Sequence, residues 1–175
     1  MPKGRLEENL RLNPQLSQKI VLSQCFVSSR EETQPELVAY ASWHLDAQPG
    51  QGLHPVHKGM PRPTDQVPAI TLDGFVERQG LSRIDLIKID TDGHEYDVLL
   101  GAQEILRRFK PQIIFELGQY VMEERGLGFE QYLAYFQALG YELFDAANKK
   151  SISAGNWATR VPRFSTIDVL ALPLR

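Results

Sequence analysis

The chain has 175 residues, 42% of them hydrophobic and 23% charged, which is the composition of a soluble globular protein with one hydrophobic core. The formal net charge of −3 argues against a nucleic-acid partner, because surfaces that bind nucleic acid are basic. No apolar stretch approaches the roughly 18–20 residues that span a bilayer, and the first residues lack the apolar core of a signal peptide, so we expect a cytoplasmic protein.

The amino-terminal part of the chain predicts a helix followed by a buried strand. The leucines within Leu6–Leu12 are spaced as on a helix, which the Asn-Pro pair at 13–14 would end. Ile20–Val27 has the apolar density of a buried strand. Glu36–Tyr40 is expected to form a short helix.

Residues 43–69 differ from the rest of the chain because prolines and glycines interrupt them throughout. We expect a long irregular loop here, and loops of this length inside a domain are usually functional or mobile. The segment also contains His44, His54 and His57. Two histidines three residues apart are a weak signal for a metal site when no regular element holds them in place.

From residue 70 onward the pattern becomes regular. Thr71 predicts the N-cap of a helix over Leu72–Gln79, and Gly80 predicts its end. The rest of the chain predicts, in order, a strand at Ile84–Ile89, a turn at Asp92-Gly93, a helix at Glu95–Phe109, a strand at Ile113–Phe115, a helix at Phe129–Leu139, and strands at Tyr141–Phe144 and Thr166–Leu172.

This alternation of strands and helices predicts an α/β fold with a parallel sheet and helices packed on its faces. The last two strands have no obvious helix between them, so we expect them to pair antiparallel as a closing hairpin. We interpret residues 1–175 as a single domain.

Carboxylates gather where two of the predicted strands end. Asp90 follows one strand and Glu116 ends the next, so the two acids are expected to lie close together at one edge of the sheet. Asp92, His94 and Glu95 follow Asp90 in the turn. Such a set can hold a divalent cation, take a proton from a hydroxyl, or bind the hydroxyls and amines of a ligand. Asp92 and Glu95 could equally cap the helix that follows them.

The same residues resemble the FkbM-type methyltransferases. The chain reads Thr-Leu-Asp at 71–73, then DLIKIDTDGHE at 85–95 and Gly-Ala at 101–102, where the family usually has Thr-Leu-Asp, "DLIKIDVEG" and "VLKGA". Lys110-Pro111 and the strand that ends in Glu116 also match. The resemblance extends over nearly the whole chain, from the LEENLRLNP segment at 6–14 to the final strand.

The resemblance implies a Rossmann-like class I methyltransferase sheet and S-adenosyl-L-methionine as cofactor. It implies methyl transfer to a hydroxyl of a sugar or natural-product-like acceptor, a small molecule or a glycan. Asp90, Glu116 and His94 are then the candidate catalytic residues. Asp90 and Asp92 are the candidate cofactor-binding residues, and Asp90, Asp92 and Glu116 would be the ligands if a divalent metal were used.

Two features depart from the family pattern. Asp92 stands where glutamate is usual, and no glycine-rich loop of the kind that holds the methionine end of the cofactor is found. The first two strands of the family sheet are therefore expected to be missing between Ile20–Val27 and Ile84–Ile89, as in a domain truncated at its amino end.

Three arrangements would account for the place of the two missing strands in the sheet. The strand at Ile20–Val27 could pair directly with the one at Ile84–Ile89, a second chain could fill the gap as a homodimer or a completing partner, or the chain could be part of a longer protein. Two functional alternatives follow. One is a non-catalytic fragment or pseudoenzyme that needs a partner chain to bind cofactor, and the other, less well supported, is a hydrolase with an acidic metal site.

Overall fold

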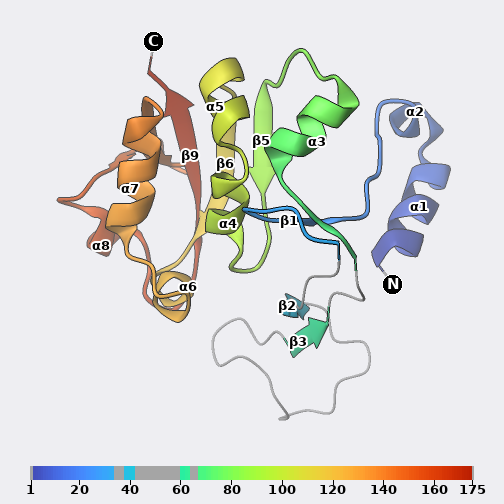
Figure 1. Cartoon of the computed structure of the whole chain (residues 1–175). Helices are drawn as coiled ribbons and strands as arrows, with labels where there is room; N and C mark the ends of the chain where they lie inside the picture. Colours follow the sequence, from blue (N-terminus) through green and yellow to red (C-terminus); the bar gives the residue numbers. More distant parts are fainter. Residues whose placement is uncertain (1, 34–37, 42–59, 64–66, 175) are drawn as a thin grey trace.

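The computed structural model describes residues 2–33, 38–41, 60–63 and 67–174. Within them the strands form two pairs and one larger sheet, whose order is β5-β6-β9-β7-β8 (Figure 1). The pairs are β1 (Phe26–Val27) with β4 (Ala69–Ile70), and β2 (Val38–Ala41) with β3 (Met60–Pro63). The larger sheet consists of β5 (Leu86–Ile89), β6 (Gln112–Leu117), β9 (Ile167–Pro173), β7 (Tyr141–Asp145) and β8 (Ser151–Ile152). The helices are α1 (Pro2–Leu12), α2 (Pro14–Ser17), α3 (Leu72–Gln79), α4 (Glu95–Leu100), α5 (Gln103–Phe109), α6 (Gln119–Glu124), α7 (Phe129–Ala138) and α8 (Trp157–Arg160).

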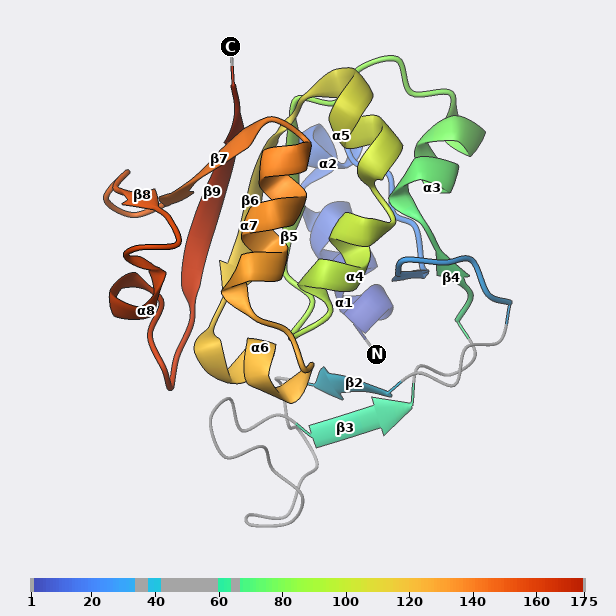
Figure 2. The ribbon, with the colours of Figure 1, turned by 60° about the vertical axis from the view of Figure 1, so that its left-hand side comes forward.

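The five-stranded sheet forms the centre of the core. β5 and β6 are parallel, and β9 lies antiparallel between β6 and β7, so the expected antiparallel pairing of the last two predicted strands is confirmed. Along β6 the side chains of Ile113, Phe115 and Leu117 are fully buried, whereas the alternate side chains, including Glu116, are more exposed. Figure 2 shows α4, α5 and α7 together on one face of the sheet, with α1 and α2 behind it.

Aromatic side chains fasten α7 to the sheet. The ring of Phe115 on β6 stacks on Tyr132 and on Phe136, with centroid distances of 5.9 and 5.3 Å. In the described residues, the buried hydrophobic side chains all belong to Ala69 or to residues after it. No helix among those residues is long and apolar enough to cross a membrane.

Side-chain caps define the starts of α3 and α5, and a left-handed glycine ends α3. The hydroxyl of Thr71 accepts a hydrogen bond from the backbone N–H of Gly74 at 3.0 Å, and α3 ends at Gly80 with φ of 62°, so both predicted boundaries are confirmed. The Asp73 carboxylate accepts from the backbone N–H groups of Glu104 and Ile105, at 3.1 and 2.9 Å. Asp73 therefore links the start of α5 to α3.

The expectation of one continuous helix over Glu95–Phe109 is wrong. The structure has two helices, α4 and α5, which are separated at Gly101 and Ala102. A Cβ atom on Gly101 would lie 2.1 Å from the carbonyl oxygen of Ser28, so the chain needs glycine where this backbone passes. The break also frees the N–H groups of α5 that Asp73 caps.

The expectation of a buried strand over Ile20–Val27 is wrong for most of that range: only its last two residues form a strand, β1, and both are half-buried. Val21 is 86% exposed and Ile20 44% exposed, because no second layer covers them in the described structure. β1 pairs with β4 rather than with β5, so direct closure onto β5 does not occur. Among the described residues no strand pairs with the outer edge of β5.

The segment between β1 and β4 also departs from expectation. Residues 38–40 of the predicted helix Glu36–Tyr40 belong to strand β2, which pairs antiparallel with β3, while residues 36–37 lie outside the described part. Pairing with a distant strand overrides the local preference here. β3 and β4 interrupt the predicted loop at 43–69 with short strands. The three histidines of this loop lie outside the described residues.

Candidate functional site

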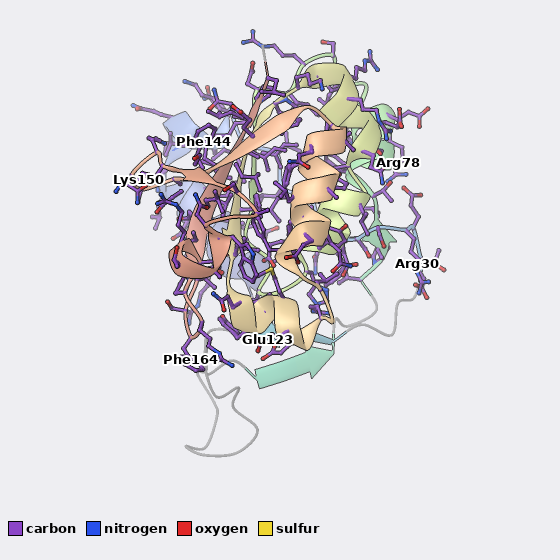
Figure 3. All side chains as sticks on the ribbon, turned by 90° about the vertical axis from the view of Figure 1, so that its left-hand side faces the viewer. Arg30, Arg78, Glu123, Phe144, Lys150 and Phe164 are labelled. Atoms are coloured by element: carbon purple, nitrogen blue, oxygen red, sulfur yellow. The ribbon has the colours of Figure 1, made fainter. Side chains whose placement is uncertain are left out.

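Asp90 and Glu116 lie at the carboxyl ends of neighbouring parallel strands, as the sequence predicted. β5 and β6 pair with Ile89 opposite Phe115, so Asp90 follows β5 at the level at which Glu116 lies on β6. α6 follows β6 at this end, and the segment before β9 returns to it. Figure 3 shows Glu123 of α6 and Phe164 of that segment at the same end of the molecule.

Glu116 is half-buried and is held from the neighbouring strand. Its Oε1 atom accepts a hydrogen bond from the hydroxyl of Thr166, the residue before β9. Burial raises the pKa of the Glu116 carboxyl above its ordinary value, and the negative charges of Asp90, Glu95 and Asp92 raise it further, against the effect of the Thr166 hydrogen bond. Glu116 is therefore the carboxylate here that is best suited to take up a proton.

Asp90 is in a different electrostatic setting because a lysine pairs with it. Lys88 Nζ lies 3.0 Å from the Asp90 carboxylate and 3.9 Å from that of Asp168, which is opposite Glu116 on β9. The hydrogen bond to Asp90, together with the charges of Asp90, Asp168 and Glu116, raises the pKa of Lys88, so this amine stays charged at neutral pH.

Glu95 shapes the turn from inside the protein. Its carboxylate is 2% exposed, and its Oε1 atom accepts hydrogen bonds from the Thr91 N–H, the Thr91 hydroxyl and the Gly93 N–H at 3.0, 3.0 and 3.2 Å. Asp92 and Gly93 adopt positive φ angles of 49° and 104°. Aspartate enters this left-handed region more readily than most residues, which accounts for aspartate at position 92. The Glu95 carboxylate therefore holds the turn before α4 and does not cap that helix, whose N-cap residue is His94 and which has no side-chain capping hydrogen bond.

His94 is buried between three elements and does not point its nitrogens at the open edge. Its Nε2 atom is 2.7 Å from Arg125 Nη2, and its ring meets that of Phe26 edge-on at a centroid distance of 4.9 Å. Arg125 can only donate, so Nε2 accepts and the ring proton is assigned to Nδ1. That atom is 3.4 Å from the Asp97 carboxylate without the alignment of a hydrogen bond, and the nearby ring lowers the pKa of Asp97.

Four residues of this edge were not among the predicted site residues: Lys88, Tyr120, Thr166 and Asp168. Burial and the charges of nearby acids, Glu116 first among them, raise the pKa of Tyr120 to about 12. The sequence does indicate Lys88 as a partner for a nearby acid, and its ion pair with Asp90, two residues later, confirms this. Thr166 and Asp168 could not be predicted from the sequence, because only the pairing of β9 with β6 brings them to Glu116.

The described residues include no group of three or more histidine, cysteine, aspartate or glutamate side chains arranged to hold a metal ion. Asp90, Asp92 and Glu116 are therefore near one another without forming such a centre. A separate cavity of about 520 Å³ lies between α3 and α5, where Asp73, Glu104 and Arg108 line it. Because none of the candidate acids lines this cavity, the chemistry of the site is not found there.

Comparison with known protein families gives a match to most of the chain. The family model described as methyltransferase FkbM domain matches residues 4–143, which include both strand-end acids and the turn between β5 and α4. No curated protein and no solved structure gives a significant match to the chain. The chain belongs to the FkbM family of methyltransferase domains.

Proposed function

We propose that this methyltransferase domain transfers a methyl group from S-adenosyl-L-methionine to a hydroxyl of a sugar or natural-product-like acceptor. The observation that carries the proposal is the half-buried Glu116 carboxyl at the carboxyl end of β6, where burial and neighbouring acids raise its pKa. A carboxylate in such a setting is a better proton acceptor than one in water. A cytoplasmic location stays a prediction from composition.

The carboxylates of this site are suited to bind the positively charged end of the cofactor. When bound, S-adenosyl-L-methionine supplies an electrophilic methyl group on a positively charged sulfur. Asp90 and Asp92 would bind the positively charged amino group of the methionine part, and the ion pair with the Lys88 amine would orient the Asp90 carboxylate. A metal is not needed for these roles.

Glu116 is assigned the role of general base. It takes the proton of the acceptor hydroxyl as the hydroxyl oxygen bonds to the methyl carbon and the bond from that carbon to sulfur breaks. Glu95 supports the turn that carries Asp90 and Asp92. His94, whose nitrogens face Arg125 and Asp97, is assigned a positioning role in place of the catalytic role that the sequence suggested.

Two variants test these roles with methyl-labelled cofactor and a panel of hydroxyl acceptors. Glu116→Gln is expected to lower kcat by roughly 10²–10⁴-fold with cofactor affinity kept, as for loss of a general base. Asp90→Asn is expected to weaken cofactor binding. Cofactor binding is measured by titration calorimetry. Unchanged turnover in Glu116→Gln contradicts the assignment of the base.

A second candidate function is favoured by the outer edge of β5, with which no strand pairs in the described part of the chain. In this alternative the domain is not catalytic by itself, and a second copy or a different chain completes the cofactor site. A sheet edge with free N–H and C=O groups is suited to pairing with another chain.

Titration of S-adenosyl-L-methionine into the isolated chain separates the two candidates. Micromolar binding by the monomer supports the first. Binding that occurs only in a dimer fraction, identified by analytical ultracentrifugation, supports the second.

A further inference from the structure

Thr166, the residue before β9, forms a hydrogen bond with Glu116 on the neighbouring strand β6. Glu116 on β6 pairs with Asp168 on β9, and Thr166 precedes Asp168 by two residues, so Thr166 and Glu116 are diagonal neighbours on one face of the sheet. The hydroxyl of Thr166 donates to Oε1 of Glu116. That bond engages one of the two carboxylate oxygens of Glu116, and among the described residues no hydrogen bond to the other, Oε2, is found.

The segment that carries Thr166 is fastened to the start of α6. The side-chain amide of Gln119 donates to the carbonyl oxygens of Val161 and Ala158 at 2.6 and 3.1 Å. A Cβ atom on Gly118 would lie 2.8 Å from the Ser165 carbonyl oxygen and 2.9 Å from the Thr166 methyl carbon. Because glycine at 118 allows this close packing, the Thr166 hydroxyl is held at a defined place beside β6.

The charged and titratable groups around Glu116 come from every element that meets this edge. They are Lys88 on β5, Asp90 and Asp92 after it, Glu95 on α4, Tyr120 on α6 and Asp168 on β9. The negative charges of Asp90, Glu95 and Asp92 raise the pKa of the Glu116 carboxyl, and Lys88 is paired with Asp90 and Asp168. Among the described residues, the Thr166 hydroxyl donates the hydrogen bond that stabilises the Glu116 carboxylate directly.

We propose that Thr166 is a positioning residue, whose hydroxyl holds Oε1 of Glu116 so that Oε2 faces the acceptor hydroxyl. This inference rests on the proposed role of Glu116 as base. In the step it supports, the acceptor proton goes to Oε2 while Thr166 keeps its own proton and its bond to Oε1. Thr166 thus limits the rotation of the carboxyl group and helps to keep it ionised before the acceptor arrives.

The proposal is tested on the isolated chain by following the Glu116 carboxyl carbon through a pH titration by ¹³C NMR, with the signal assigned by its loss in Glu116→Gln. In Thr166→Val, which keeps the shape but not the donor, the titration midpoint is expected to move upward by about one pH unit, which is about the contribution of one charge-assisted hydrogen bond. Thr166→Ser, which restores a hydroxyl, is expected to titrate like the wild type.

Thr159→Val is the matched control, because the Thr159 hydroxyl donates to the Asn156 carbonyl on exposed α8 and has no contact with Glu116. Its titration is expected to equal that of the wild type. If Thr166→Val does not fold, Thr166→Ala is compared with Thr166→Ser instead. An unchanged Glu116 midpoint in a folded variant that lacks the hydroxyl overturns the proposal.

The titration needs neither cofactor nor acceptor, so its result is independent of whether the domain transfers methyl groups. Where turnover is measured, Thr166→Val is expected to lower kcat with little change in KM, and Thr166→Ser to restore it. Loss of turnover in Thr166→Val without a shift of the Glu116 midpoint also overturns the proposal, since it indicates a structural role alone.

Discussion

Two apolar segments of similar appearance in the sequence differ fully in the structure. Ile20–Val27 forms only the short strand β1, and Val21 is 86% exposed. Ile113–Phe115 lies within β6, between β5 and β9, and its first and last side chains are fully buried. The difference shows that apolar density becomes a buried strand only where neighbouring strands and a covering helix layer are present.

The largest expected effect is a difference in the free energy of unfolding between variants of the two segments. Phe115→Ala removes a ring that packs on Tyr132 and Phe136 in the core, and it is expected to lower the free energy of unfolding by about 3–5 kcal/mol. Val21→Ala is expected to change it by less than about 0.5 kcal/mol, because Val21 is exposed. Urea denaturation of both variants measures this. Equal losses would contradict the contrast between the segments.

An intermediate effect on stability is expected at Gly101, where the junction of α4 and α5 contacts the chain just after β1. Gly101→Ala places a methyl group against the Ser28 carbonyl oxygen, and it is expected to cost about 1–3 kcal/mol as β1 is pushed from the junction of α4 and α5. Hydrogen exchange at the Ser28 N–H, which donates to the Ile70 carbonyl, is expected to accelerate. Gly155→Ala, where no atom lies within 4 Å, is the control and should leave that exchange unchanged.

The smallest expected effect concerns pH and Glu116. Its pKa is raised in the folded state by burial first, so its contribution to stability is fully present below the ordinary glutamate pKa and is lost as the pH rises through the folded pKa. Glu116→Gln cannot ionise and still offers an oxygen to Thr166. The wild type is therefore expected to lose stability relative to this variant as the pH rises toward neutral.

Urea denaturation of the wild type and Glu116→Gln at several pH values measures that difference. A wild type that gains stability relative to the variant over this range would contradict the raised pKa. The core variant Phe115→Ala serves as a control, because Phe115 does not ionise and its stability difference from the wild type should depend little on pH.

Much of the region after residue 70 could be predicted because its signals are local. Thr71 caps a helix with its own hydroxyl, and Gly80 ends that helix in a left-handed conformation. The strand-end positions of Asp90 and Glu116 follow from two apolar runs joined by one crossover. The break at Gly101 could not be predicted, because the reason for it is the Ser28 backbone, more than seventy residues earlier in the chain.

The candidate site also has features that local sequence predicts and features that depend on distant contacts. The sequence by itself determined the acids of the turn and of β6, since a motif within one short stretch of chain contains them. Only the tertiary structure decided the roles of Glu116 and His94, because Thr166 and Arg125 act through contacts between elements that are far apart in sequence. Asp90 is paired, His94 is enclosed, and Glu116 is held by a hydroxyl that lies fifty residues away in sequence and directly beside it in space.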